Sequence, residues 1–402
     1  MLNTAFSPWP SFSEEEVEAA ARVLRSGRVN YWTGGEAKAF EQEFADWCGA
    51  RHAIALANGT LALELALRAL RIGPGDEVVV PSRTFVATAS AVVQCGAAPV
   101  CADVDADSQN VTAETIAAAL SERSRAVICV HLAGWPCDMD PIRELCEARG
   151  LYLIEDCAQA HGARYKGRSV GTIGDIGCWS FCQDKIMTTG GEGGMVTTDR
   201  RDWFEAMWAF KDHGKSWQAV HAREHPPGFR WLHESFGSNY RMTEMQAAIG
   251  RIQLRRMPEW SRARRANAER IWRAAAQSQA LRAPTPPDGF DHAAYKAYVF
   301  VRPGALVDGW TRDRIAAAIE AEGVPCYTGS CSEIYLEKAF AGLGLGPKRR
   351  LPNAKALGED SLMFLVHPTL REEEIAKTCA ALKSVMARAT QNESDARTGT
   401  AG

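Results

Sequence analysis

From about residue 52 to residue 200, the chain alternates short apolar runs with longer stretches in which apolar residues recur at helical spacing. HAIAL, EVVVP, APVCADV, RAVICVHL and LYLIED have the length of buried strands, and TLALELALRAL and DPIRELCEARG between them fit helices. This alternation predicts an α/β fold in which helices cover a mostly parallel sheet. The strand-like runs IGCWSFC and GGMVTT have little helix between them, so we expect the sheet to finish in a different direction.

Helical patterns lie on both sides of this region. Ser13 and Glu16 form a capping-box pattern ahead of VEAAARVLRSG, and Gly27 is placed to end that helix. A long helical pattern covers about 242–280, and the Pro-rich segment APTPPDG at 283–289 is typical of a linker.

These patterns predict two domains and a tail. We expect a large domain with an N-terminal helical segment at residues 1–250, and a linking helix with a smaller C-terminal α+β domain at residues 251–388. The polar residues 389–402 are expected to be a disordered tail.

The composition narrows the class of protein. Of the 402 residues, 46% are hydrophobic and 24% are charged, and the net charge of -3 does not favour nucleic acid or an anionic membrane. We see no apolar run long enough to span a bilayer and no secretory signal. The twelve cysteines are dispersed and lack zinc-ligand spacing, so we expect no metal site and reduced thiols in a cytoplasmic protein.

Lys185 lies between an apolar strand and the glycine-rich turn TTGGEGG. A lone lysine is most often a solvated surface residue. Burial, however, lowers the pKa of a lysine and makes it a nucleophilic amine that can bond to an aldehyde cofactor. The glycines allow the backbone to turn closely beneath a flat ring.

Asp156 stands at the carboxyl end of the strand LYLIED, and Gln159 follows within the same turn. Functional groups of open parallel sheets gather at these strand ends. A carboxylate there can keep a pyridine nitrogen protonated, and Gln159 can reach the phenolic oxygen of the same ring. The alternative is that Asp156 only caps the following helix.

Gly59 and Thr60 separate a strand from an apolar helix in ANGTLALELALRAL. The N–H groups and the dipole of such a helix start suit a phosphate group. The same pair also caps helices that bind no ligand.

The sequence resembles the DegT/DnrJ/StrS family of sugar aminotransferases over long segments in the same order. This family belongs to the fold type I (aspartate aminotransferase-like) enzymes that use pyridoxal 5'-phosphate (PLP). The similar segments extend from residue 9 to residue 385 and include NYWTGGEAKAFEQEFA, GPGDEVVVPSRTFVATASAV, LIEDCAQAHGARYKGRSVGTIGDIGCWSF, KIMTTGGEGGMVTT and GSNYRMTEMQAAIGRIQL. The resemblance implies the three-layer PLP-dependent transferase fold.

The resemblance also implies roles for matching positions. Lys185 would be the catalytic lysine that holds the cofactor. Asp156 would face the pyridine nitrogen of the cofactor, and Gln159 would lie beside its phenolic oxygen. Phe85 would stack on the ring. Phosphate contacts would come from a further set of residues: Gly59, Thr60, Ser180 and, from the neighbouring subunit, Asn239. The protein is therefore expected to be a homodimer with shared active sites.

The expected reaction moves an amino group from L-glutamate to a nucleotide-linked keto-sugar, in the biosynthesis of deoxy-amino sugars. Alternatives are a keto-cyclitol acceptor, a PLP-dependent sugar dehydratase on the same fold, or a non-catalytic regulator. Relatives that act as dehydratases carry histidine at the position of Lys185, so the lysine favours transamination. Trp32, Tyr298 and Tyr327 are candidates for stacking on sugar or base, and each is also a candidate for the core.

Overall fold

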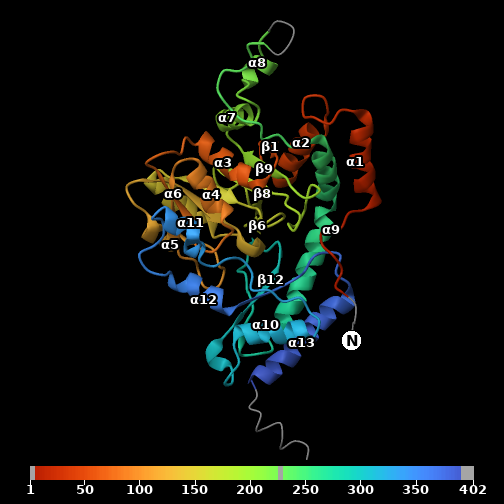
Figure 1. The fold of residues 1–402 in the computed structure, drawn as a ribbon, viewed down its shortest axis with the longest axis vertical. Coiled ribbons are helices and arrows are strands. Elements are labelled where there is room, and N and C mark those ends of the chain that lie inside the picture. Colours follow the sequence, from red (N-terminus) through yellow and green to blue (C-terminus); the bar gives the residue numbers. More distant parts are fainter. Residues whose placement is uncertain (1–4, 225–229, 391–402) are drawn as a thin grey trace, which may run out of the picture.

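The computed structural model describes residues 5–224 and 230–390. A seven-stranded sheet in the order β1-β9-β8-β5-β4-β2-β3 lies at its centre (Figure 1). Strands β2, β3, β4, β5 and β8 are parallel, whereas β9 is antiparallel to both β8 and β1. The mostly parallel sheet and its change of direction after β8 are therefore confirmed. Its strands are β1 (His52–Leu56), β2 (Glu77–Pro81), β3 (Ala98–Ala102), β4 (Ser124–Val130), β5 (Tyr152–Asp156), β8 (Ile176–Ser180) and β9 (Gly194–Thr198).

Helices cover both faces of this sheet, because alternate strand residues point to opposite sides. In β2, Val78 and Val80 pack in a cluster with Leu63 of α3, whereas Val79 packs with Ile142 of α6. The three layers of the predicted α/β fold follow from this pattern. The covering helices are α3 (Gly59–Ala69), α4 (Ala87–Gln94), α5 (Ala113–Ala119), α6 (Met139–Arg149) and α7 (Arg201–Lys211).

The N-terminal helices pack against the long connecting helix α9. The predicted capping box is present: the N–H of Ser13 donates to the Glu16 carboxylate at 2.7 Å, and Gly27 ends the helix at φ +66°. Arg251 of α9 pairs with Glu43 of α2 at 2.6 Å. These helices are α1 (Glu14–Ser26), α2 (Glu36–Cys48) and α9 (Glu244–Ala275).

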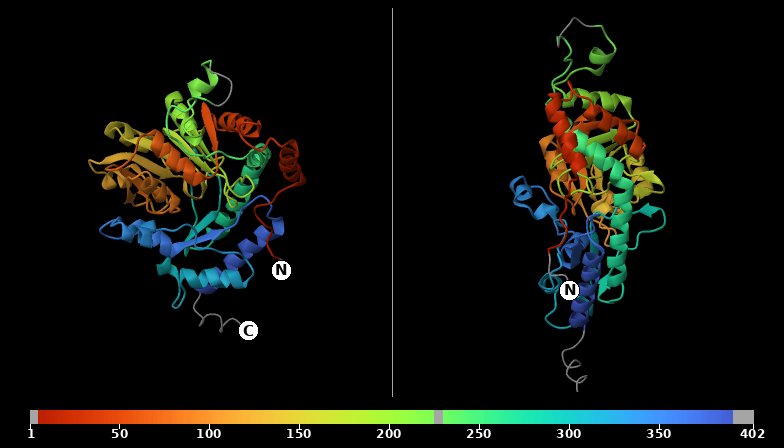
Figure 2. Two further views of the ribbon diagram at one scale, coloured as in Figure 1. Left: turned by 45° about the horizontal axis from the view of Figure 1, so that its top comes forward. Right: turned by 90° about the vertical axis from the view of Figure 1, so that its right-hand side faces the viewer.

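The C-terminal elements form the smaller α+β unit at one end of the molecule (Figures 1 and 2). Its three-stranded sheet has the order β10-β12-β13 and shares a buried cluster with α9, α10 and α13. The predicted domain boundary at residue 250 falls inside α9. Helix α13 continues to Thr390, and residues 391–402 of the predicted tail lie outside the described residues. The unit contains β10 (Leu281–Arg282), β12 (Ala297–Val301), α10 (Arg312–Ala321), β13 (Ser361–Phe364) and α13 (Glu372–Thr390).

The remaining elements are short. A second three-stranded sheet has the order β11-β6-β7. Helix α8 belongs to an arm that protrudes from the end of the molecule opposite the C-terminal unit (Figure 1). These elements are β6 (Arg164–Tyr165), β7 (Arg168–Ser169), β11 (Phe290–Asp291), α8 (Trp217–His221), α11 (Lys338–Gly342), α12 (Pro352–Asp360) and the 3₁₀ turns at Leu132–Gly134, Pro303–Ala305 and Ile334–Leu336.

The N-terminal segment runs beside the C-terminal unit (Figure 2). The N–H of Ser7 donates to the carboxylate of Glu374 in α13 at 2.6 Å. No helix among residues 5–224 and 230–390 has the length and apolarity that crossing a membrane requires.

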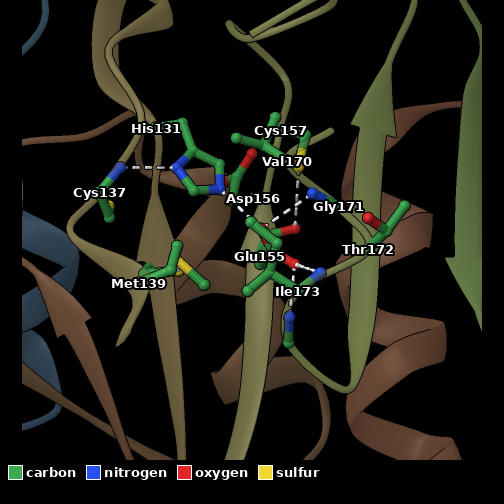
Figure 3. Close-up of polar contacts among 12 residues, drawn as sticks. His131, Cys137, Met139, Glu155, Asp156, Cys157, Val170, Gly171, Thr172 and Ile173 are labelled. Carbon is green, nitrogen blue, oxygen red and sulfur yellow. Dashed lines mark hydrogen bonds and ion pairs between the residues drawn. The ribbon is translucent and has the colours of Figure 1, made fainter. Parts of the chain in front are cut away.

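A buried carboxylate fixes the loop that joins β5 to β8 (Figure 3). Glu155 accepts hydrogen bonds from the N–H groups of Gly171, Ile173 and Gly174 at 2.8, 2.7 and 2.6 Å. The Nε2 atom of His131 lies 3.0 Å from the same carboxylate. Burial alone would raise the pKa of Glu155, but the hydrogen bonds from His131 and from the backbone N–H groups lower it.

The partners of His131 fix its tautomer. Its Nδ1 atom accepts from the N–H of Cys137 at 3.0 Å, so the ring proton is on Nε2 and points to Glu155. The thiol of Cys157 is close enough that it, Glu155 and His131 could together hold a metal ion. Both carboxylate oxygens and both ring nitrogens already have partners, so we assign this cluster a structural role.

We predict that Glu155→Ala lowers the free energy of unfolding by about 3–5 kcal/mol, because three N–H groups and a histidine lose their buried acceptor. Urea unfolding followed by circular dichroism measures the change. Glu147→Ala is the control, since the Glu147 side chain is 68% exposed and its salt bridge to Arg143 lies on the helix surface. We expect the control to change stability by less than about 1 kcal/mol. Equal effects of the two substitutions would contradict the role of Glu155.

Candidate active site

The predicted site residues meet at the carboxyl ends of the parallel strands, where the chain leaves the sheet. Seven of the eight line one cavity of about 650 Å³: Gly59, Thr60, Phe85, Asp156, Gln159, Ser180 and Lys185. We call this space the inner cavity. The eighth residue, Asn239, is exposed and is not among its lining residues.

Asp156 lies at the base of the inner cavity, on the last position of β5. Its side chain accepts from the hydroxyl of Thr88 and from the N–H of Ala158, each at 3.1 Å. Burial raises its pKa above the ordinary value, although these hydrogen bonds and the charge of Lys185 oppose the shift. A cation bound beside Asp156 would reverse this shift and hold it ionised.

Gln159 is oriented by the backbone. Its side-chain oxygen accepts from the N–H of Ala133 at 2.8 Å, which places the amide NH₂ group as the free donor. Since Gln159 lines the cavity, this donor is available to an acceptor bound there.

The start of α3 closes another side of the inner cavity. Asn58 caps the helix by accepting from the N–H of Leu61 at 3.0 Å. The N–H groups of Gly59 and Thr60 precede the first backbone hydrogen bond within the helix. A Cβ atom at Gly59 would lie 2.6 Å from the Cβ of Ser180, so only glycine permits this close approach.

Lys185 is held by a contact with the N-terminal segment. The indole N–H of Trp9 donates to the carbonyl oxygen of Lys185 at 2.9 Å. The lysine side chain is 16% exposed, and its Nζ lies 3.7 Å from a carboxylate oxygen of Asp184. Its amine therefore borders the cavity without being exposed to bulk solvent.

A second cavity of about 630 Å³ begins where the first ends, and it extends between the large domain and the C-terminal unit. Phe85, Gln159 and Lys185 line both cavities. Tyr298 and Tyr327, two of the predicted stacking residues, line this outer cavity. Trp32 lines a separate cavity and donates its indole N–H to Asp212 at 2.6 Å.

Comparisons with known proteins agree with this arrangement. The model of the DegT/DnrJ/EryC1/StrS aminotransferase family matches residues 10–383. The chain belongs to this family.

Two relatives show how far the similarity extends. The UDP-N-acetyl-3-dehydro-alpha-D-glucosamine 3-aminotransferase of Acidithiobacillus ferrooxidans is 37% identical over 392 residues, 96% of each chain. The crystal structure of an aminotransferase from Psychrobacter cryohalolentis is 57% identical and superposes with a TM-score of 0.94, over 96% of this chain and 100% of that one.

The cofactor of the family is PLP. A putative sugar aminotransferase of Streptococcus pneumoniae, solved in its PLP form, is 26% identical with a TM-score of 0.83, over 96% of this chain and 99% of that one. The inner cavity of this aminotransferase fits the cofactor. It offers a buried carboxylate, an amide donor, a lysine amine and a helix start kept open by Gly59.

Several residues of the aminotransferase site were not predicted from the sequence. Asp184 and Lys296 line the outer cavity, and the hydroxyl of Tyr295 donates to Asp184. Trp9 and Thr88 hold Lys185 and Asp156 in place. An acidic residue directly before the candidate cofactor lysine was the one visible signal, in SFCQDK.

Proposed function

We propose that this aminotransferase transfers an amino group from L-glutamate to a nucleotide-linked keto-sugar. The observation that carries the proposal is the pair of joined cavities, with Lys185 at their junction. The inner cavity has the groups that PLP needs, and the outer one has the volume and the tyrosines to receive a sugar. The relative from Acidithiobacillus, whose name specifies a UDP-linked keto-sugar, supports this acceptor class.

We assign each residue of the inner cavity a task. When bound, PLP supplies an electron-withdrawing ring that stabilises negative charge on the carbon next to the transferred nitrogen. Asp156 holds a proton on the ring nitrogen, and the NH₂ group of Gln159 donates to the phenolic oxygen. Lys185 would hold the aldehyde of PLP and would move a proton at the substrate carbon as general base and acid.

The phosphate of PLP is assigned to the start of α3. The N–H groups of Gly59 and Thr60, with the hydroxyls of Thr60 and Ser180, are the donors on this chain. Phe85, which is 67% exposed, offers its ring from the rim of the cavity.

The absorbance spectrum tests the function. With PLP bound, we expect a visible band that L-glutamate removes and that a keto-sugar acceptor restores. Lys185→Ala should lose the band and lower turnover by about 10²- to 10⁴-fold or more. An active Lys185→Ala variant would refute the role of the lysine, and a wild-type band that L-glutamate leaves unchanged would refute the donor.

Gly59→Ala tests the phosphate site. The added methyl group would overlap Ser180, and an overpacking cost of about 1–3 kcal/mol predicts PLP binding weakened by about 5- to 150-fold. Equilibrium dialysis with PLP measures the affinity. The control is Gly35→Ala, because a Cβ at Gly35 meets no atom within 4 Å. Unchanged affinity in Gly59→Ala would exclude α3 as the phosphate site.

We further propose that the enzyme is a homodimer with shared active sites, in the cytoplasm. Asn239 forms an isolated β-bridge with Asp212, and the chain between these two residues carries α8 and the side chains of Trp231 and Phe236, which are 83% and 101% exposed. Such large exposed aromatic side chains suit an interface. Lys185 is the only cationic side chain that lines the inner cavity of the described chain, so a PLP phosphate gains from a donor of the partner. The twelve unpaired cysteines fit a reducing compartment.

Complementation tests the shared site. We expect Asn239→Ala and Lys185→Ala to be weakly active or inactive alone, and their co-expression to restore activity. In a two-fold dimer, random pairing makes about a quarter of all sites complete. Activity no greater than the sum of the separate variants would show that Asn239 serves its own chain.

A further inference from the structure

Two side chains of opposite charge face the outer cavity beside Lys185. Asp184 directly precedes Lys185 in the sequence. Lys296 directly precedes β12 of the C-terminal unit. Both line the outer cavity, and Asp184 also lines the inner one. Asp184 is the only carboxylate among the outer cavity's lining residues.

Asp184 is held as a carboxylate next to the reacting amine. One of its oxygens lies 3.7 Å from the Nζ of Lys185, and the other accepts from the hydroxyl of Tyr295. Burial would raise its pKa, but Lys185, Tyr295 and the charge of Lys296 lower it. About half of its side chain stays exposed, so it remains accessible to a bound molecule.

Lys296 is an ammonium group without a contact ion pair in the part of the chain that the structure describes. Its Nζ lies 4.9 Å from the ring centroid of Tyr295, and the Nζ of Lys185 lies 5.4 Å from the same centroid. Burial lowers its pKa to about 8, and the nearby positive charges of Arg264 and Lys185 add to this shift. An anion bound at Lys296 would relieve both effects.

We propose that Asp184 and Lys296 form the recognition site for the zwitterionic amino-acid donor. Asp184 receives its ammonium group and Lys296 receives its α-carboxylate. The two side chains line the same cavity, and no ion pair joins them in the described part of the chain, so a ligand in this cavity can contact both. This inference rests on the proposed aminotransferase reaction and deepens it.

The geometry favours the donor over the sugar substrate. An amino acid carries its two charges on one carbon, so a ligand that satisfies both side chains brings its nitrogen next to Lys185. A nucleotide-linked keto-sugar has anionic phosphate groups but no ammonium group. Its phosphates could pair with Lys296 and its hydroxyl groups could donate to Asp184, but it has no cationic group to balance the charge of that carboxylate.

Separate titration of the two half-reactions tests the proposal. PLP-loaded enzyme is titrated with L-glutamate, and the amine-loaded form is titrated with the keto-sugar, while the visible band is followed. Lys296→Met should raise the half-saturating concentration of L-glutamate by about 10- to 100-fold, the loss of one charge-assisted hydrogen bond. We expect Lys296→Arg to fall between Lys296→Met and the wild type, and the keto-sugar titration to stay unchanged. Lys348→Met on an exposed turn is the matched control.

Glutarate gives a readout without turnover, because it has carboxylates and no ammonium group. Its binding, measured by calorimetry, should weaken in Lys296→Met. In Asp184→Asn it should be unchanged or tighter, while L-glutamate binding weakens.

The opposing results are distinct. A shift in the keto-sugar titration alone would assign Lys296 to the phosphate groups and overturn the proposal, and so would the absence of any shift. If L-amino acids do not convert the wild-type band, the proposed function fails, and glutarate binding still decides whether the subsite exists.

Discussion

Successive side chains of a β-strand point to opposite faces, and at the end of β5 this rule separates two carboxylates with different tasks. Glu155 turns to one side, where three backbone N–H groups and His131 bind it. Asp156 turns to the other side and forms the base of the inner cavity. Glu155 binds the loop that leads into β8, and β8 ends at Ser180, shortly before Lys185. The positions of Ser180 and Lys185 therefore depend on Glu155. The site therefore depends on a buried anion that never touches it.

The two cavities differ in the charged groups that line them. The inner one presents a buried carboxylate at one end and a helix start at the other, which suits a ring with a cationic nitrogen and an anionic phosphate. The outer one presents an ammonium and a carboxylate across open space, with tyrosines around them. Lys185 lines both cavities, so under the proposed function one amine would face both the cofactor and the substrate.

The sequence predicted most of the inner cavity, because its residues follow strands that apolar runs identify. Asp156 ends β5 and Gln159 follows it, whereas Lys185 follows β8. Ser180, which ends β8, was implied only by the family resemblance. The outer cavity was largely missed, since it forms between segments far apart in the chain. Trp9 and Lys296 approach Lys185 only after the C-terminal unit folds back.

Other failures have different causes. An aromatic residue has no periodic pattern that separates a stacking surface from the core, so Trp32 could not be distinguished from Tyr298 and Tyr327. The bound orientation of Gln159 also required the structure, because it depends on the N–H of Ala133 across the sheet edge. Asn239 shows the limit for a single chain, since the phosphate that we propose it contacts would belong to the neighbouring subunit.

The N-terminal segment connects the C-terminal unit to the backbone of Lys185. Ser7 is bound to Glu374 in the C-terminal unit, and two residues later Trp9 is bound to the carbonyl of Lys185. The two units are thus linked by a rigid helix on one path and by a short tether on another. Residues 6–9 of this segment also line the outer cavity, so one short stretch of chain contributes to the wall of that cavity and holds the backbone of the lysine at its inner end.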